Sequence, residues 1–176
     1  MSPLRLAVDV VVARIPLASR WASERWQPVA VEIVAPRAGA PAARDVVPGS
    51  GPSVRFVDDA DRWRCSGFEI ELHPIEAEGY FLNLSAADPR IFVMWRLFDD
   101  GVMPPARPVL VTVSYNEAAR LMDGGEQVDG VPMLPSIAEW MRAFVEVHYK
   151  GEPRRKARRN DPFADAPPAE PREPQR

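Results

Sequence analysis

The sequence has few of the residues that catalytic and metal sites usually require. Its 176 residues include one cysteine, Cys65, and two histidines, His73 and His148. A single cysteine excludes an intramolecular disulfide and is typical of a protein from a reducing compartment. Metal sites take three or four ligands, and no cluster of cysteine and histidine is present. A glycine-rich phosphate loop is also missing. We therefore expect neither a metal nor an organic cofactor.

Long apolar runs are absent as well. No stretch approaches the roughly 20 apolar residues that a helix needs to cross a bilayer. The apolar N-terminal segment is interrupted by Asp9 and Arg14, which is unlike a secretory signal peptide. We expect a cytoplasmic protein that has no membrane partner.

The charge is divided unevenly along the chain. Residues 1–149 hold 14 basic and 20 acidic side chains, whereas residues 150–176 hold 8 basic and 5 acidic ones. Nucleic-acid-binding domains are usually strongly basic. Because the main part of this chain is acidic, a nucleic-acid partner is not expected.

The composition changes near Lys150. Residues 1–150 contain apolar residues at strand and helix spacing and predict one β-rich globular domain with a C-terminal amphipathic helix. Residues 151–176 contain six prolines and, apart from Phe163, almost no large apolar residue. Such a segment buries too little surface to offset its ordering entropy, so it is predicted to be a disordered basic and proline-rich tail.

Alternating apolar residues predict most of the domain as strands. Short turns between them favour antiparallel pairing, and Pro28 suits the start or the edge of a strand. Apolar residues occupy both faces of 91–98, so this strand is either central in its sheet or presents one face to a partner. The predicted strands cover residues 6–12, 26–34, 53–57, 68–72, 80–84, 91–98 and 108–113, with a long loop over 35–52.

Two helices are expected after these strands. Ser114 with Glu117, and Ser136 with Glu139, have the spacing of capping boxes. The first helix is short, and the second carries an apolar stripe that ends near Lys150. The predicted fold is therefore α+β and mainly β. It is an antiparallel sandwich or a small barrel of about six or seven strands, capped by one short and one longer helix.

The candidate catalytic groups have simpler structural interpretations. Cys65 lies beside Arg64, which could lower the pKa of its thiol, but no histidine stands at a visible partner position. An inert cysteine within a strand is favoured. The acidic run from Glu69 to Glu78 is interpreted mostly as a solvated face, and both histidines as packed or hydrogen-bonded side chains. No catalytic residue is assigned.

Partner contacts are expected from aromatic residues in the domain and from the tail. Trp21 and Trp26 flank a connecting segment, where aromatic residues often contact partners. Phe92 and Met94 belong to the strand that is apolar on both faces. In the tail, a basic run precedes Phe163, which is the natural anchor of a short linear motif. The run consists of Arg154, Arg155, Lys156, Arg158 and Arg159.

Several stretches resemble a proteobacterial family of unknown function whose genes lie beside those for molybdenum-dependent formate dehydrogenases and their maturation factors. The likeness covers most of residues 5–150, without one diagnostic motif. It rests on 14–17 with Trp21, and on 26–31, 80–84, 108–114, 116–118, 124–126, 131–135 and 140–148.

The resemblance implies a non-enzymatic accessory or assembly protein that acts by protein–protein binding. The implied partner is a formate dehydrogenase subunit or maturation factor. A β-barrel carrier of a small apolar ligand is the alternative, because antiparallel barrels can enclose one ligand and five tryptophans could line the cavity. An enzyme that uses Cys65 is a third hypothesis.

Overall fold

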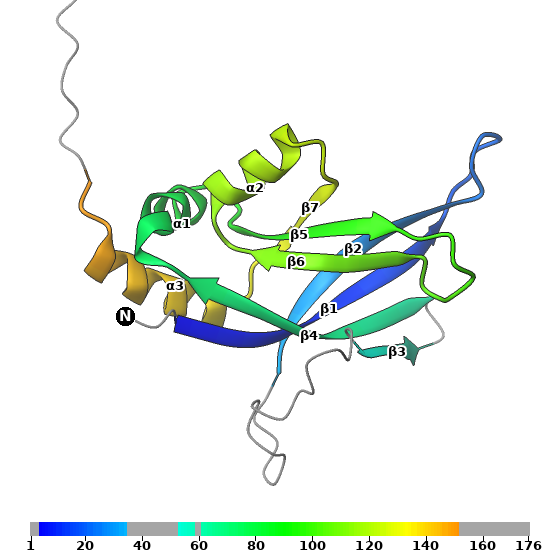
Figure 1. Cartoon of the computed structure of the whole chain (residues 1–176), viewed down its shortest axis with the longest axis horizontal. Coiled ribbons are helices and arrows are strands. Elements are labelled where there is room, and N and C mark those ends of the chain that lie inside the picture. Colours follow the sequence, from blue (N-terminus) through cyan, green and yellow to red (C-terminus); the bar gives the residue numbers. More distant parts are fainter. Residues whose placement is uncertain (1–3, 35–52, 59–60, 152–176) are drawn as a thin grey trace, which may run out of the picture.

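The computed structural model describes residues 4–34, 53–58 and 61–151. Within these ranges the chain forms two antiparallel sheets that pack against each other, with three α-helices around them (Figure 1). The strands are β1 Leu4–Pro16, β2 Glu24–Ile33, β3 Ser53–Asp58, β4 Arg62–Leu72, β5 Arg90–Leu97, β6 Ala106–Thr112 and β7 Val128–Pro132. The helices are the 3-10 turn η1 Pro74–Glu76 and the α-helices α1 Ala77–Leu84, α2 Tyr115–Asp123 and α3 Pro135–His148.

The first sheet has the strand order β2-β1-β4-β3. Val8, Val10 and Val12 of β1 are fully buried, as the alternation of apolar residues predicts. Pro28 lies opposite Val12 on the edge strand β2, where the pairing with β1 is irregular. The expected edge position of this proline is therefore confirmed, because an edge strand tolerates the missing N–H group.

The second sheet has the order β6-β5-β7, with β5 in its centre. β5 is the strand that is apolar on both faces, and its central position is one of the two alternatives that the sequence left open. Ile91 and Val93 are fully buried on one face, and Met94 is buried as well.

The space between the sheets is filled by large side chains. Neither sheet closes on itself or on the other, so the sandwich is confirmed and the barrel is not. Helix α3 contributes apolar residues to the same core, as its periodicity predicts. The fully buried large residues are Tyr80, Ile70, Leu72, Ile91, Ile137, Met141, Val8, Val10, Val12, Val31, Val93 and Val113.

Two elements differ from the sequence prediction. Residues 80–84 form most of helix α1 and not a strand, because the buried positions Ala77, Tyr80 and Asn83 recur with helical spacing. The short strand β7 was not predicted, since Asp129 and Gly130 are unusual within strands.

One expected capping box is half confirmed and the other is wrong. Ser114 caps α2 by accepting a hydrogen bond of 3.1 Å from the Glu117 N–H. The Glu117 carboxylate does not return to Ser114 but accepts from the Thr112 hydroxyl at 2.5 Å. Helix α3 begins at Pro135, so Ser136 lies inside its first turn and does not cap it.

The remaining sequence predictions concern either membranes or undescribed residues. Among the described residues, no helix is both long enough and apolar enough to span a bilayer. The predicted loop over 35–52 and the predicted tail after Gly151 lie outside the described residues.

Candidate functional site

The predicted partner residue Trp21 lies in the loop between β1 and β2. Its side chain is 85% exposed, and the Arg20 guanidinium lies 4.9 Å from the ring centroid. The Trp21 N–H donates to the Ser19 hydroxyl at 3.2 Å. An indole that is so exposed contributes little to folding and is free to contact another molecule.

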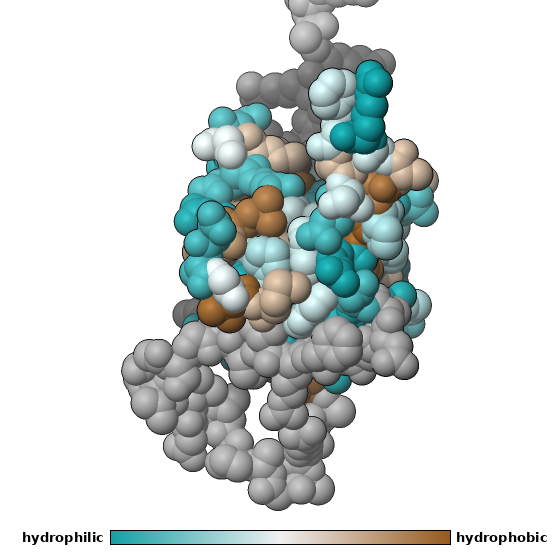
Figure 2. All heavy atoms as spheres, turned by 90° about the vertical axis from the view of Figure 1, so that its right-hand side faces the viewer, coloured by the Kyte–Doolittle hydropathy of each residue, from teal (hydrophilic) through white to brown (hydrophobic). Residues whose placement is uncertain are grey.

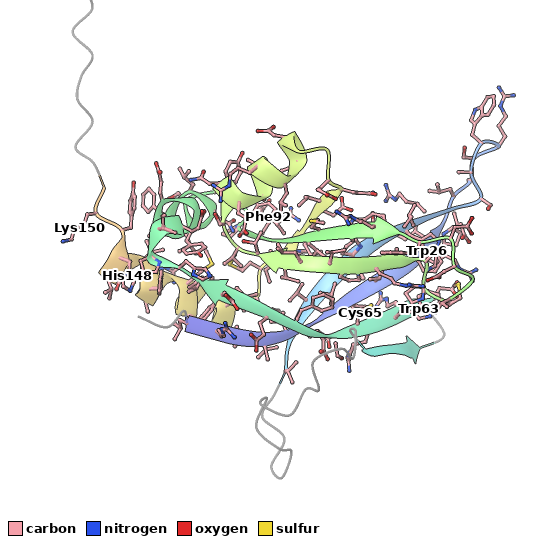
Figure 3. All side chains as sticks on the ribbon, viewed as in Figure 1. Trp26, Trp63, Cys65, Phe92, His148 and Lys150 are labelled. Atoms are coloured by element: carbon pink, nitrogen blue, oxygen red, sulfur yellow. The ribbon has the colours of Figure 1, made fainter. Side chains whose placement is uncertain are left out.

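Trp26 belongs to the core, in contrast to Trp21. It is 8% exposed, and its ring lies 4.9 Å from the ring of Trp63 with a tilt of 49° between the planes. Its indole N–H donates to Glu24 at 3.0 Å. Figure 3 shows Trp26 and Trp63 at one end of the sandwich, with Cys65 further inside. Trp21 and Trp26, which the sequence analysis grouped together, thus have different surroundings: one is exposed and the other is in the core.

Phe92 and Met94 lie on the central strand β5. Met94 is 6% exposed, which leaves little of it to contact a partner. Phe92 is half-buried and meets Tyr115 of α2 edge-on at 6.2 Å between ring centroids. The remaining candidates, Phe163 and the basic run Arg154, Arg155, Lys156, Arg158 and Arg159, lie outside the described residues.

An exposed apolar cluster that the sequence analysis missed lies at the β5–β6 connection. Its members come from the last residue of β5 and from the loop that follows. Their exposed fractions are 61% for Leu97, 40% for Phe98, 58% for Val102 and 49% for Met103. The available signal was the pair Val102-Met103 between Gly101 and Pro104, because apolar residues in a glycine- and proline-containing loop lack an obvious place in the core.

Arg107 of β6 holds this loop in one shape. Its guanidinium donates to both carboxylate oxygens of Asp100, at 2.7 and 2.6 Å. It also donates to the carbonyl oxygens of Val102 and Pro104, at 3.2 and 3.3 Å, and lies over the Phe98 ring at 4.9 Å. The ion pair lowers the pKa of Asp100, mainly through the side-chain hydrogen bond from Arg107. The exposed apolar side chains are therefore presented by a structured loop.

The β5–β6 loop and the β1–β2 loop lie at the same end of the molecule (Figure 1). Figure 2 views the molecule from this end, where apolar side chains lie between polar ones. We call Leu97, Phe98, Val102 and Met103 the end surface, and Trp21 lies in the other loop at the same end of the molecule. Exposed apolar residues that gather in one region are typical of binding surfaces.

The candidate catalytic groups are placed unfavourably for chemistry. Cys65 is 1% exposed, and burial raises the pKa of its thiol to about 11. A thiol of this kind is protonated at neutral pH and a poor nucleophile. His73 lies 3.1 Å from Glu71, and His148 packs against Phe144 with ring centroids 4.2 Å apart. The packed or hydrogen-bonded interpretation of both histidines is confirmed.

A polar network joins η1 and α1 to α2. The Ser114 hydroxyl donates to Glu76 at 2.7 Å, and Arg120 donates to the other oxygen of the same carboxylate at 2.6 Å. Glu76 thus links η1 to α2 and is not part of a solvated acidic face. The described residues contain no group of three or more histidine, cysteine, aspartate or glutamate residues that could hold a metal ion.

Asn83 forms a second structural network. It is 2% exposed, and its amide nitrogen donates to the carbonyl oxygens of Arg90 and Val113 at 2.7 and 2.8 Å. Its amide oxygen accepts from the Arg90 N–H at 2.9 Å. This single side chain therefore ties α1 to β5 and to the segment that enters α2.

The described residues thus form an α+β sandwich that exposes apolar side chains at one end. The chain belongs to the family described as protein of unknown function (DUF3305), whose family model matches residues 7–158. Comparison with curated proteins and with solved structures found no match for this chain.

Proposed function

We propose that this protein is a non-enzymatic accessory or assembly protein that acts by binding another protein. The proposed partner is a formate dehydrogenase subunit or one of its maturation factors. The identity of the partner follows from the family resemblance in the sequence. The mode of action is supported by the end surface, where a structured loop presents apolar side chains to the solvent.

The main support for the proposal is that the β5–β6 loop is ordered and yet exposes apolar side chains. A loop that exists only to connect two strands needs no apolar tip, and exposed Leu97 and Val102 add a solvation cost. Arg107 orders the loop before any partner arrives, through its paired hydrogen bonds to Asp100. Preorganisation reduces the ordering entropy that binding must otherwise overcome.

The environment of Cys65 supports a binding role over an enzymatic one. The only thiol in the sequence is buried, and its raised pKa keeps it protonated. An enzyme based on this cysteine would have to open its core to expose the nucleophile. Cellular activity that is unchanged in Cys65→Ser would end the enzymatic hypothesis.

The ligand-carrier alternative receives less support from the fold. A carrier needs an enclosed apolar space, whereas the interior of this sandwich is packed with valine, isoleucine, leucine and aromatic side chains. The alternative stays a prediction that native mass spectrometry of freshly purified protein can test. A bound small molecule in that spectrum would favour the carrier over the accessory protein.

Affinity capture from native cells tests the proposed partner. A tagged full-length chain should recover a formate dehydrogenase subunit or a maturation factor under gentle conditions. The double variant Leu97→Asp/Val102→Asp should lose this recovery, because two charges would have to be desolvated at the interface. Recovery of neither protein by the unchanged chain would contradict the proposal.

Val147→Asp is the matched control for this experiment. Val147 is 69% exposed on α3, at the other end of the sandwich, so the substitution also replaces an exposed valine by aspartate. This control should capture the partner as well as the unchanged chain does. Equal loss in the control and in the double variant would show that the end surface is not the binding site.

A further inference from the structure

Strand β4 has an unpaired edge over its second half. On one side, Phe68, Ile70 and Leu72 lie opposite β1. On the other side, β3 pairs with β4 only as far as Ser66. Among the described residues, no strand therefore pairs with 67–72 on the side away from β1. Alternate residues of an edge strand direct free N–H and C=O groups outward, where another extended chain can pair with them.

Strand β6 has a free edge that lies close to this part of β4. It pairs with β5 on one side, and no described strand pairs with it on the other. The two strands belong to different sheets but lie next to each other (Figure 1). An open cleft of about 1130 Å³ is lined by Ser66 to Glu69 and Glu71 of β4 and by Val109 to Thr112 of β6, and it continues over β1 and β2. Because the cleft runs beside a free strand edge, it can accept an extended chain as an added strand.

The cleft carries more acidic than basic side chains. Arg5 lies between two carboxylates, 3.4 Å from Glu69 and 3.0 Å from Glu71. Arg64 lies 2.6 Å from Glu32. Two arginines therefore face five carboxylates, which belong to Asp9, Glu32, Glu69, Glu71 and Glu117. The excess negative charge favours a positively charged ligand.

Asp9 and Arg64 form an ion pair in the cleft, with Arg64 Nε 3.9 Å from Asp9 Oδ2. Asp9 Oδ1 and Arg64 Nε are buried and make no hydrogen bond. Val109 of β6 is 44% exposed and supplies apolar surface on the opposite wall. The cleft thus combines a free strand edge, negative charge and apolar contacts, which together match an extended peptide.

We propose that this cleft binds an extended peptide segment of a partner protein, rich in arginine or lysine, which adds as a strand to the free edge of β4. Its basic side chains approach Glu69 and Glu71, and alternate apolar side chains contact β6. This inference goes beyond the proposed function, because the cleft is distinct from the end surface and its test does not depend on the identity of the captured partner.

The first experiment uses a fluorescent peptide of about seven alternating arginine and valine residues, a length that matches the six residues of the free edge. Anisotropy with the full-length chain in about 0.1 M salt should show saturable binding, whereas the matched glutamate–valine peptide should not bind. Amide hydrogen exchange at 68–72 should slow when the basic peptide is bound. Absence of binding, or binding without slower exchange at this edge, would overturn the proposal.

Charge reversal then locates the site. Glu69→Lys/Glu71→Lys should weaken binding of the arginine–valine peptide by about tenfold or more, because attraction becomes repulsion. The control Glu78→Lys/Glu139→Lys makes the same change in net charge on two exposed glutamates that do not line the cleft. It should weaken binding only slightly. Equal weakening in both variants would mean that the peptide responds to the overall charge and not to the cleft.

A third peptide, with the sequence of residues 152–165, distinguishes a partner segment from the chain's own basic run. Weaker binding than that of the arginine–valine peptide supports a partner segment. Binding of equal or greater affinity, with the same dependence on Glu69 and Glu71, would overturn the assignment to a partner. The occupant would then be the tail of this chain.

Discussion

Gly79 of α1 and Ser114 at the start of α2 are in direct contact, and no side chain fits between them. A Cβ atom on Gly79 would overlap the Ser114 hydroxyl and would lie 3.2 Å from the backbone nitrogen of Asn116. The same hydroxyl caps α2 and donates to Glu76. The close approach of the two helices thus depends on the absence of a side chain at position 79.

Gly79→Ala is therefore expected to destabilise the protein. Alanine is favoured over glycine inside a helix by about 1 kcal/mol, so the substitution would be stabilising without the contact. Overpacking against Ser114 should reverse the sign and lower the free energy of unfolding by about 1–3 kcal/mol in urea denaturation. Gly151→Ala, where the new Cβ would lie 3.7 Å from the Tyr149 ring, is the control and should be nearly neutral. A stabilised Gly79→Ala would contradict this account.

Asn83→Asp should be more damaging than Asn83→Ala. The aspartate would place a carboxylate oxygen where the amide nitrogen now donates to Arg90 and Val113. A buried charge that faces two carbonyl oxygens costs about 3–5 kcal/mol, compared with about 1–3 kcal/mol for the unmet polar groups that alanine leaves. Both costs are measurable as shifts of the urea midpoint.

Asn116→Asp is the matched control for this prediction. Asn116 lies in the first turn of α2, where the helix dipole favours negative charge. Its substitution should leave the urea midpoint unchanged or raise it. If Asn83→Asp were as stable as this control, the hydrogen bonds from Asn83 to β5 would not contribute to stability as the structure indicates.

Strand periodicity predicted most of the sandwich, and its failure at α1 has an identifiable cause. Tyr80, Leu82 and Leu84 alternate, but Leu82 is 42% exposed and the buried position between them is Asn83. A polar residue in the core conceals a helical stripe, because pattern reading assigns asparagine to the surface. Its burial is explained by three hydrogen bonds, two to Arg90 and one to Val113, and Val113 lies 30 residues further along the chain.

The candidate site was less predictable than the fold. Trp21 and Trp26 have similar sequence surroundings, and only the pairing of Trp26 with Trp63 places one in the core. Leu97 continues the apolar run of β5, so its exposure depends on where the strand ends. The cleft could not be predicted from the sequence either, because it arises where β4 and β6 come together and not from a local motif.

Alkaline pH should destabilise the protein through two buried groups. Burial raises the pKa of Cys65 from 9.0 to about 11 and that of Tyr80 from 10.0 to about 12. Between pH 9 and 11 the unfolded thiol loses its proton while the folded thiol keeps it, so a rising pH favours unfolding. Tyr80 adds the same effect between pH 10 and 12. Urea midpoints measured from pH 8 to pH 11 should therefore fall.

Two variants separate these contributions. Cys65→Ala should be less stable at every pH because of its cavity, but its midpoint should fall less steeply above pH 9. Tyr80→Phe should flatten the curve above pH 10. Curves that run parallel to that of the unchanged chain would show that neither group titrates abnormally.

Arg107→Lys should disturb the β5–β6 loop without unfolding the sandwich. Lysine cannot donate to both oxygens of Asp100 or bridge to the Val102 and Pro104 carbonyl groups at the same time. The ion pair is exposed to solvent and screened by it, so its loss should have little effect on the free energy of unfolding. The melting temperature should change little, but amide exchange at 98–103 should accelerate and partner capture should weaken.

Arg96→Lys provides the comparison for Arg107→Lys. Arg96 also donates twice to one carboxylate, that of Glu126, at 3.1 and 2.5 Å, but this pair does not support the loop. If the end surface binds because its loop is preorganised, Arg96→Lys should retain normal loop exchange and normal capture. The weaker capture by Arg107→Lys should then come from slower formation or faster dissociation of the complex at unchanged fold stability. If Arg107→Lys accelerated loop exchange but captured the partner normally, binding would not depend on the order of the loop. The exposed side chains of Leu97 and Val102 would then be the determinants to test.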